Sequence, residues 1–104
     1  MAWIPVCRLD ELVEDEGVRI DVDGRALAAF MAGGEFFVTD DACTHGQSSL
    51  SEGYVEPDCS VECIAHMARF SLRTGEVLAP PATIPIRVYE VEVAGDHLLV
   101  LLDD

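Results

Sequence analysis

Two short segments in the middle of the chain each place a cysteine close to a histidine. Cys43 precedes His45 with one residue between them, and Cys63 precedes His66 with two residues between them. Seventeen residues separate His45 from Cys63. Thiolate sulfur and imidazole nitrogen are ligands that transition metals prefer. The pattern therefore predicts a metal centre with two sulfur and two nitrogen ligands, drawn from two separate loops.

Two kinds of metal centre use this ligand set. A single zinc ion takes two cysteines and two histidines in a tetrahedron. A binuclear iron–sulfur cluster of the Rieske kind takes two cysteines on one iron and two histidines on the other. Zinc ligands that are close in sequence usually have at least two residues between them, whereas Cys43 and His45 have one. That spacing favours the binuclear cluster, with each loop serving both irons. A plant-type cluster does not fit, because Cys43, Cys59 and Cys63 lack its C-x4-C-x2-C spacing.

The sequence on either side of these segments predicts β-strands. Val18, Ile20 and Val22 alternate with charged residues, which is typical of a half-buried strand. The pairs Asp23-Gly24 and Gly33-Gly34 are tight-turn signals, so we expect consecutive hairpins. An edge strand containing Pro5 and one helical turn capped by Asp10 precede them. The expected strands cover residues 3–7, 18–23, 26–31 and 35–39.

The end of the chain predicts a closing hairpin, with strands at residues 84–94 and 97–102 joined at Gly95-Asp96. The apolar positions of its first strand change face near Val88. Such a change of phase predicts a β-bulge or a strand break at that point. By contrast, residues 41–83 show little periodicity, and a loop-rich stretch of this length in a small domain predicts that a metal holds it together.

Length and charge limit the function. A chain of 104 residues is expected to form one domain, residues 1–104, with a metal-binding subdomain at about 41–83. The formal net charge is −14, and all six basic residues are arginines. Phosphate backbones and anionic membranes repel such a surface, so neither nucleic acid nor membrane is an expected partner. The first residues lack the pattern of a secretory signal, so we expect a cytoplasmic protein with reduced cysteines.

The chain resembles the Rieske-type ferredoxins of bacterial aromatic-ring-hydroxylating dioxygenases, such as those that serve biphenyl, toluene or naphthalene dioxygenase. The resemblance covers nearly the whole chain, and the two cysteine–histidine segments carry it. Further matches follow the second segment at Phe70 and around the pair Pro80 and Pro81. The remaining matches are Ser49-Leu50-Ser51-Glu52-Gly53 and Arg73-Thr74-Gly75-Glu76.

The resemblance implies an all-β Rieske fold, in which an antiparallel β-sandwich base carries a loop-built cluster-binding subdomain. It implies one [2Fe–2S] cluster, with Cys43 and Cys63 on the inner iron and His45 and His66 on the outer iron. The imidazole edges are then the expected exit for electrons. Pro80 and Pro81 would form a third loop over the cluster, and Gly46 a turn that a Cβ atom would hinder.

The reduction potential is expected to be low. High-potential respiratory Rieske proteins carry two further cysteines, joined in a disulfide, where this chain has Ser48 and Ala65. They also carry a serine that donates a hydrogen bond to a cluster sulfide, where this chain has Ala68. Fewer hydrogen bonds to sulfur stabilise the reduced cluster less, which predicts a midpoint of roughly −150 mV.

The other residues with reactive or charged side chains considered for a role are not assigned as cluster ligands. Cys7 is predicted to be a small buried residue in a strand, and Cys59 to share the strand parity of Cys63 and pack beneath the cluster. His97 is expected on the surface. Arg69 is either an internal counter-charge or a contact for a partner.

The resemblance implies a soluble one-electron carrier and not an enzyme. A flavin-containing, NADH-dependent ferredoxin reductase would reduce it, and it would pass electrons to a terminal Rieske oxygenase. Two alternatives stay open at this point. One is the Rieske-like small subunit of a cytoplasmic reductase such as nitrite reductase, and the other is a structural zinc-binding module.

Overall fold

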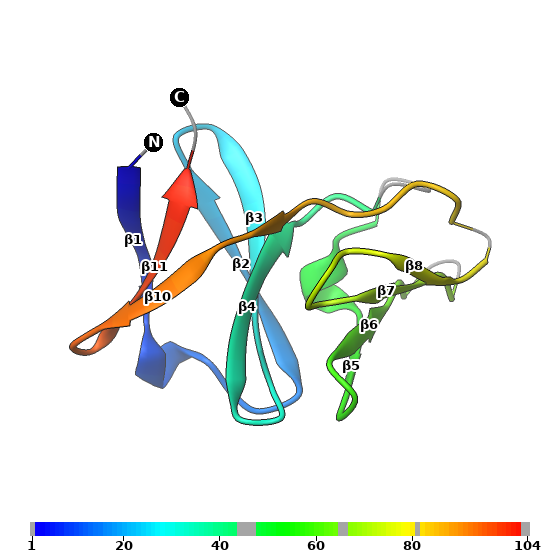
Figure 1. Ribbon diagram of the computed structural model, residues 1–104, viewed down its shortest axis with the longest axis horizontal. Helices are drawn as coiled ribbons and strands as arrows, with labels where there is room; N and C mark the ends of the chain where they lie inside the picture. The colour runs from blue at the N-terminus through cyan, green and yellow to red at the C-terminus, as the bar shows by residue number, and fades with distance from the viewer. Residues whose placement is uncertain (1, 44–47, 65–66, 81, 103–104) are drawn as a thin grey trace.

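Two antiparallel sheets form the base of the molecule (Figure 1). The structure, a computed structural model, describes residues 2–43, 48–64, 67–80 and 82–102. The first sheet has the strand order β1-β11-β10. It consists of β1 (Ala2–Arg8), β10 (Val91–Ala94) and β11 (His97–Leu102). The second sheet has the order β2-β3-β4-β9. It consists of β2 (Glu16–Val22), β3 (Arg25–Ala32), β4 (Glu35–Asp40) and β9 (Val88–Tyr89). The expected all-β fold on an antiparallel base is confirmed.

The two predicted hairpins of the second sheet are present, and their turns explain their sequences. The turn between β2 and β3 places Asp23 at φ 50° and Gly24 at φ 81°. The turn between β3 and β4 places Gly33 at φ 60° and Gly34 at φ 76°. Two consecutive left-handed residues match the right-handed twist of the strands that they join, and glycine adopts this conformation without strain.

The central strand β3 is buried on both faces and separates two hydrophobic cores. Leu27 and Ala29 pack into the core between the two base sheets. Ala28 and Phe30 point to the opposite face and pack into the core of the metal-binding subdomain. These four side chains are all completely buried. The continuous apolar run of β3 is therefore what a strand with a core on each side requires.

A third sheet forms the metal-binding subdomain, to the right of the base in Figure 1. Its strands lie in the order β5-β6-β7-β8 and pair antiparallel. They are β5 (Tyr54–Glu56), β6 (Ser60–Glu62), β7 (Arg69–Ser71) and β8 (Val77–Ala79), preceded by the 3₁₀ turn η2 (Leu50–Glu52). The prediction of a loop-built subdomain is thus incomplete. Each of these strands has three residues, which is too short for a periodic pattern to show in the sequence.

The break predicted near Val88 is present, at Glu90. There the chain leaves β9, which pairs with β4, and enters β10, which pairs with β11. The expected strand over residues 84–87 is absent. In its place, Ile86 donates a backbone hydrogen bond to Gly75 (2.9 Å), and Arg87 accepts one from Asp40 (3.0 Å). These bonds hold the segment as an extended connection between the subdomain and the base.

At the other end, β1 is an edge strand as predicted, with an irregularity between Pro5 and Cys7. A 3₁₀ turn, η1 (Leu9–Glu11), follows it. The prediction that Asp10 caps this turn is wrong, because Arg8 occupies the cap position and Asp10 lies inside the turn. The Asp10 carboxylate instead pairs with the Arg8 guanidinium at 3.3 Å. Among the described residues, no helix is long and apolar enough to cross a membrane.

Candidate metal centre

The first cysteine-containing loop begins where β4 ends. The backbone N–H of Cys43 donates to the carbonyl of Ser48 at 2.9 Å, across the loop. Next to this bond, Ala42 and Ser49 form an antiparallel bridge. One step further back, Leu50 donates to the carbonyl of Asp41 at 2.7 Å. The segments that enter and leave the loop are thus hydrogen-bonded to each other as far as Cys43. This cysteine therefore lies where the loop opens, at its mouth.

The second loop repeats this arrangement between β6 and β7. The N–H of Cys63 donates to the carbonyl of Ala68 at 2.6 Å. In both loops, therefore, the cysteine N–H bonds to the carbonyl five residues ahead. Met67 closes the turn by donating to the carbonyl of Cys63 at 3.0 Å, and it adopts a φ of 62°. Of the described residues in this turn, Met67 has a positive φ and Ala68 does not, so alanine fits at position 68.

Both cysteines face the same hydrophobic core. The exposed fraction is 3% for Cys43 and 0% for Cys63. They share one buried cluster with Phe30, Leu50 and Phe70. None of the four cysteines of the chain forms a disulfide. Two reduced, buried thiols at the mouths of two matching loops fit the role of ligands to one inner metal ion.

The two predicted histidine ligands, His45 and His66, lie outside the described residues, as do Gly46, Ala65 and Pro81. Within the part that the structure describes, no group of three or more histidine, cysteine, aspartate or glutamate side chains could hold a metal ion.

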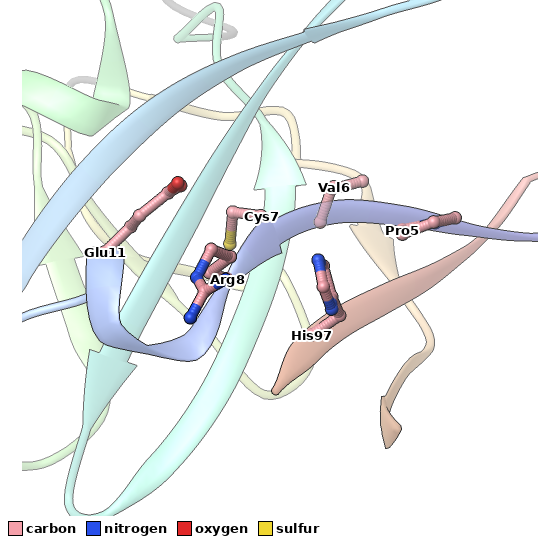
Figure 2. A pocket seen from close by; sticks show the side chains of 6 residues that line it. All are labelled: Pro5, Val6, Cys7, Arg8, Glu11 and His97. Carbon is pink, nitrogen blue, oxygen red and sulfur yellow. The ribbon is translucent and has the colours of Figure 1, made fainter. Parts of the chain in front are cut away.

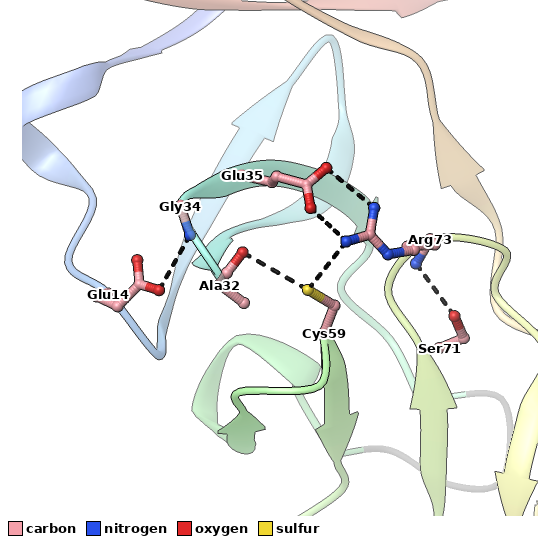
Figure 3. A network of polar contacts seen from close by, with 7 residues as sticks. All are labelled: Glu14, Ala32, Gly34, Glu35, Cys59, Ser71 and Arg73. Carbon is pink, nitrogen blue, oxygen red and sulfur yellow. Dashed lines mark hydrogen bonds and ion pairs between the residues drawn. The ribbon is translucent and has the colours of Figure 1, made fainter.

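Cys59 lies at the junction between the subdomain and the base, beside Ala32 and Arg73 (Figure 3). Its φ of 65° places it in the turn before β6, so the expected strand parity with Cys63 is wrong. Its thiol donates to the carbonyl of Ala32 at 3.6 Å and accepts a hydrogen bond from Arg73 at 3.6 Å. The side chain is buried in the same core as Cys63, which fits a packing role.

Arg73 joins the two parts of the molecule. It forms a two-pronged ion pair with Glu35 at the start of β4, and its guanidinium lies 5.5 Å from the centre of the Phe37 ring. Hydrogen bonding to Arg73 holds the pKa of the Glu35 carboxyl below its usual value. The sequence holds no signal for this pair, because 38 residues separate its members.

Arg69 lies directly across the β6–β7 pair from Glu62. Its guanidinium is 3.9 Å from the Glu62 carboxylate, whose side chain is 18% exposed. This pair fits the internal counter-charge, and the Arg69 side chain, 40% exposed, is also accessible to a partner.

The segment that holds Arg87 and Tyr89, which follows the prolines of the expected third loop, is tied to the base beside β4. The Tyr89 hydroxyl donates to Asp40 at 2.5 Å, and the Arg87 guanidinium lies 4.7 Å from the centre of the Tyr89 ring. Burial, together with the hydrogen bond to Asp40, raises the pKa of Tyr89 above its usual value. Asp40 thus fixes this segment at the point where β4 leads into the first loop.

A surface depression of about 310 Å³ lies on the base, between β1, η1 and the start of β11 (Figure 2). Six residues line it: Pro5, Val6, Cys7, Arg8, Glu11 and His97. Burial, and to a lesser degree the nearby Glu11 carboxylate, raise the pKa of the Cys7 thiol. A protonated, buried thiol is a poor nucleophile and a poor metal ligand, so Cys7 is a packing residue as predicted. His97 is exposed, also as predicted.

Comparison with known proteins identifies the family. Residues 2–90 match the model of the Rieske [2Fe-2S] domain. The whole chain is 43% identical to the 3-phenylpropionate/cinnamic acid dioxygenase ferredoxin subunit of Escherichia coli (strain K12), and the match covers 97% of that protein.

Two solved structures extend the comparison. The Sphingomonas yanoikuyae B1 ferredoxin superposes with a TM-score of 0.92 at 31% identity, over 98% of this chain and 100% of the other. A chain from the complex of reduced oxygenase and oxidized ferredoxin in carbazole 1,9a-dioxygenase superposes with a TM-score of 0.86 at 36% identity, over 94% and 91% of the two chains. The resemblance to dioxygenase ferredoxins is confirmed. The chain belongs to the Rieske [2Fe–2S] family, and it is a ferredoxin of that family with a Rieske-type [2Fe–2S] cluster as its cofactor.

Proposed function

We propose that this ferredoxin carries single electrons from a flavin-containing, NADH-dependent reductase to a terminal Rieske oxygenase that hydroxylates aromatic rings. The observation that carries the proposal is 43% identity, along the full chain, to a dioxygenase ferredoxin subunit. A related ferredoxin is known in complex with its oxygenase, which supports the second partner. The chain by itself is then an electron-transfer component and not an enzyme, and its place is the cytoplasm, where NADH is available.

In this proposal Cys43 and Cys63 hold the inner iron, and His45 and His66 hold the outer iron. The burial of both cysteines and the matching closure of their loops support the first half of the assignment. The spacing of the histidines within the same two loops supports the second half. When bound, the cluster accepts and releases one electron.

The chain's own residues serve this role in two ways. The buried core around Phe30, Leu50 and Phe70 keeps water from the cysteine side of the centre. On the second loop, Ile64 and Met67 are 48% and 70% exposed. They flank the predicted ligand His66 in sequence and offer a partner an apolar contact beside the expected electron exit.

A reconstituted electron-transfer assay tests the proposal. The cluster-loaded chain replaces the ferredoxin subunit in the Escherichia coli 3-phenylpropionate dioxygenase system, and NADH consumption and substrate hydroxylation are followed. The chain is expected to restore hydroxylation that is coupled to NADH. A loaded chain that accepts no electrons from the reductase and passes none to the oxygenase would contradict the proposal.

Variants test the ligand roles separately. His45→Ala and His66→Ala should each prevent stable assembly of a reducible cluster, whereas His97→Ala, which changes an exposed histidine on the base, should leave it intact. Visible absorption and iron content of the purified proteins measure this. A normal cluster in both loop variants would refute the assignment of the outer iron.

The net charge of −14 adds a kinetic expectation. Weak electron-transfer complexes commonly form by electrostatic steering, so the association rate with a basic surface on a partner should fall steeply as ionic strength rises. Stopped-flow oxidation of the reduced ferredoxin by the oxygenase, measured over a range of salt concentrations, checks this. A rate that is independent of salt would assign the acidic surface to solubility alone.

A further inference from the structure

Each of the two cysteine-containing loops lies at one end of a β-hairpin. The first loop follows β4, the second strand of the β3–β4 hairpin, and the second loop connects β6 to β7. At the ends away from these loops, the two hairpins meet at the junction between the base and the subdomain (Figure 3). Glu35, the first residue of β4, lies on one side of this junction, and Cys59 and Arg73, which flank the β6–β7 pair, lie on the other. A contact at this junction can therefore fix the spacing of the two hairpins.

The backbone of the subdomain holds Arg73 at the junction. The N–H of Leu72 donates a hydrogen bond to the carbonyl of Cys59 at 2.9 Å, which closes the open end of the β6–β7 pair. The Ser71 hydroxyl accepts from the N–H groups of Arg73 and Thr74, at 3.2 and 3.3 Å. These bonds fix the backbone from which the Arg73 side chain extends toward the base (Figure 3).

The Arg73 guanidinium contacts the base through two side chains of β4. It donates two hydrogen bonds to the Glu35 carboxylate, one of them at 2.9 Å, and it lies over the Phe37 ring. It also donates to the Cys59 thiol at 3.6 Å, and that thiol donates to the carbonyl of Ala32, in β3, at 3.6 Å. Most exposed ion pairs add little stability, but a two-pronged arginine–carboxylate pair within a wider set of contacts is of the kind that does.

We propose that the Arg73–Glu35 pair is a positioning device for the metal centre. It ties the β3–β4 hairpin to the β6–β7 hairpin and so holds the two loops at the separation that one cluster requires. The proposal rests on the ligation by Cys43 and Cys63 proposed above. A cluster held by two loops is released when the loops move apart, so a contact that restricts this local opening slows the release.

The rate of cluster loss into a chelator tests the proposal. Arg73→Gln and Glu35→Gln should each lose the visible absorption of the cluster about fivefold faster than the wild type, because removing such a contact shifts a local opening equilibrium by about that factor. The double variant should be no faster than either single variant, because both changes remove the same interaction.

The matched control is Arg8→Gln. It removes the same charge from an ion pair with Asp10 that lies within the base, and the Arg8 side chain is 53% exposed against 52% for Arg73. This control should lose its cluster at the wild-type rate. Equal rates in Arg73→Gln and Arg8→Gln would overturn the proposal. A double variant whose acceleration is the product of the two single effects would show that the residues act independently, which would also overturn it.

Amide hydrogen exchange of the same cluster-loaded proteins separates positioning from a general loss of stability. In Arg73→Gln, exchange should become faster in the β6–β7 hairpin and stay unchanged in the β2–β3 hairpin of the base. Exchange that rises equally in both hairpins would assign the pair to overall stability and contradict the proposal. A wild type that takes up no cluster would instead overturn the ligand assignment, and its absorption spectrum shows this before any variant is compared.

Discussion

Gly75 is the residue on which the connection between the metal-binding subdomain and the base depends most directly. Its φ is 80°, and a Cβ atom placed there would lie 2.0 Å from the carbonyl oxygen of Ile86. Gly24 has almost the same φ, 81°, but a Cβ there would meet nothing within 4 Å. Alanine substitutions at these two positions therefore carry the same backbone strain and differ in the clash.

The expected costs follow from these contacts. Left-handed backbone costs an alanine roughly 1–2 kcal/mol, and this is the whole effect expected for Gly24→Ala. Gly75→Ala must in addition push Ile86 away. That movement breaks the hydrogen bond from Ile86 to Gly75, worth about 1 kcal/mol, and exposes part of a buried side chain whose full burial is worth about 1.5–3 kcal/mol. We expect a total of about 4 kcal/mol for Gly75→Ala.

Thermal unfolding of the two cluster-loaded variants, followed anaerobically by far-ultraviolet circular dichroism, measures the difference. One kcal/mol corresponds to about 4–8 °C in Tm for a domain of this size, so Gly75→Ala should melt at least about 10 °C below Gly24→Ala. Visible absorption should also show faster cluster loss, because the displaced segment follows the third loop. Equal melting temperatures for the two variants would refute the role given to this contact.

Three further predictions concern Tyr89, Cys7 and Ala68. Because burial raises the Tyr89 pKa, the folded state favours the neutral phenol, so the stability that this residue contributes should be fully present below about pH 10 and lost as the pH rises further. Tyr89→Phe should remove this loss of stability at alkaline pH, as measured by unfolding at a series of pH values. An unchanged pH profile would contradict the assignment. Because its pKa is raised, the Cys7 thiol should react with iodoacetamide at pH 8 at least about tenfold more slowly than the thiol of glutathione does, as followed by peptide mass mapping. Comparable reaction rates would show that the Cys7 thiol is accessible. Ala68→Ser should place a hydroxyl in the buried second loop and raise the midpoint from its expected value of roughly −150 mV in redox titration, and an equal or lower midpoint would argue against hydrogen bonding to sulfur as the cause of the low potential.

The features that could be predicted from the sequence are those that local chemistry determines. The turn pairs Asp23-Gly24 and Gly33-Gly34 require left-handed backbone, and the change of phase near Val88 leaves a single strand no consistent buried face. The cysteine–histidine spacing likewise identifies the two loops before any fold is known. In each case the signal lies within a few neighbouring residues.

The features that could not be predicted depend on contacts between distant residues. The ion pair of Glu35 with Arg73 joins residues 38 positions apart, and nothing in either local sequence indicates its partner. Asp41 reads as one more acid in an acidic chain, and its burial follows only from the packing of β3 and η2 around it. The strands β5 to β8 have three residues each, which is too few for a periodic pattern to show, and they are held by pairing with one another and by the core around Phe70.

The central claim is that Cys43, His45, Cys63 and His66 hold a Rieske-type cluster. The most direct measurement is the low-temperature electron paramagnetic resonance spectrum of protein that has been purified without oxygen and reduced with dithionite. The assignment predicts a rhombic signal whose average g value lies clearly below that of clusters ligated by cysteine alone, because two nitrogen ligands replace two sulfurs. A silent spectrum from protein that contains one zinc ion per chain would contradict it.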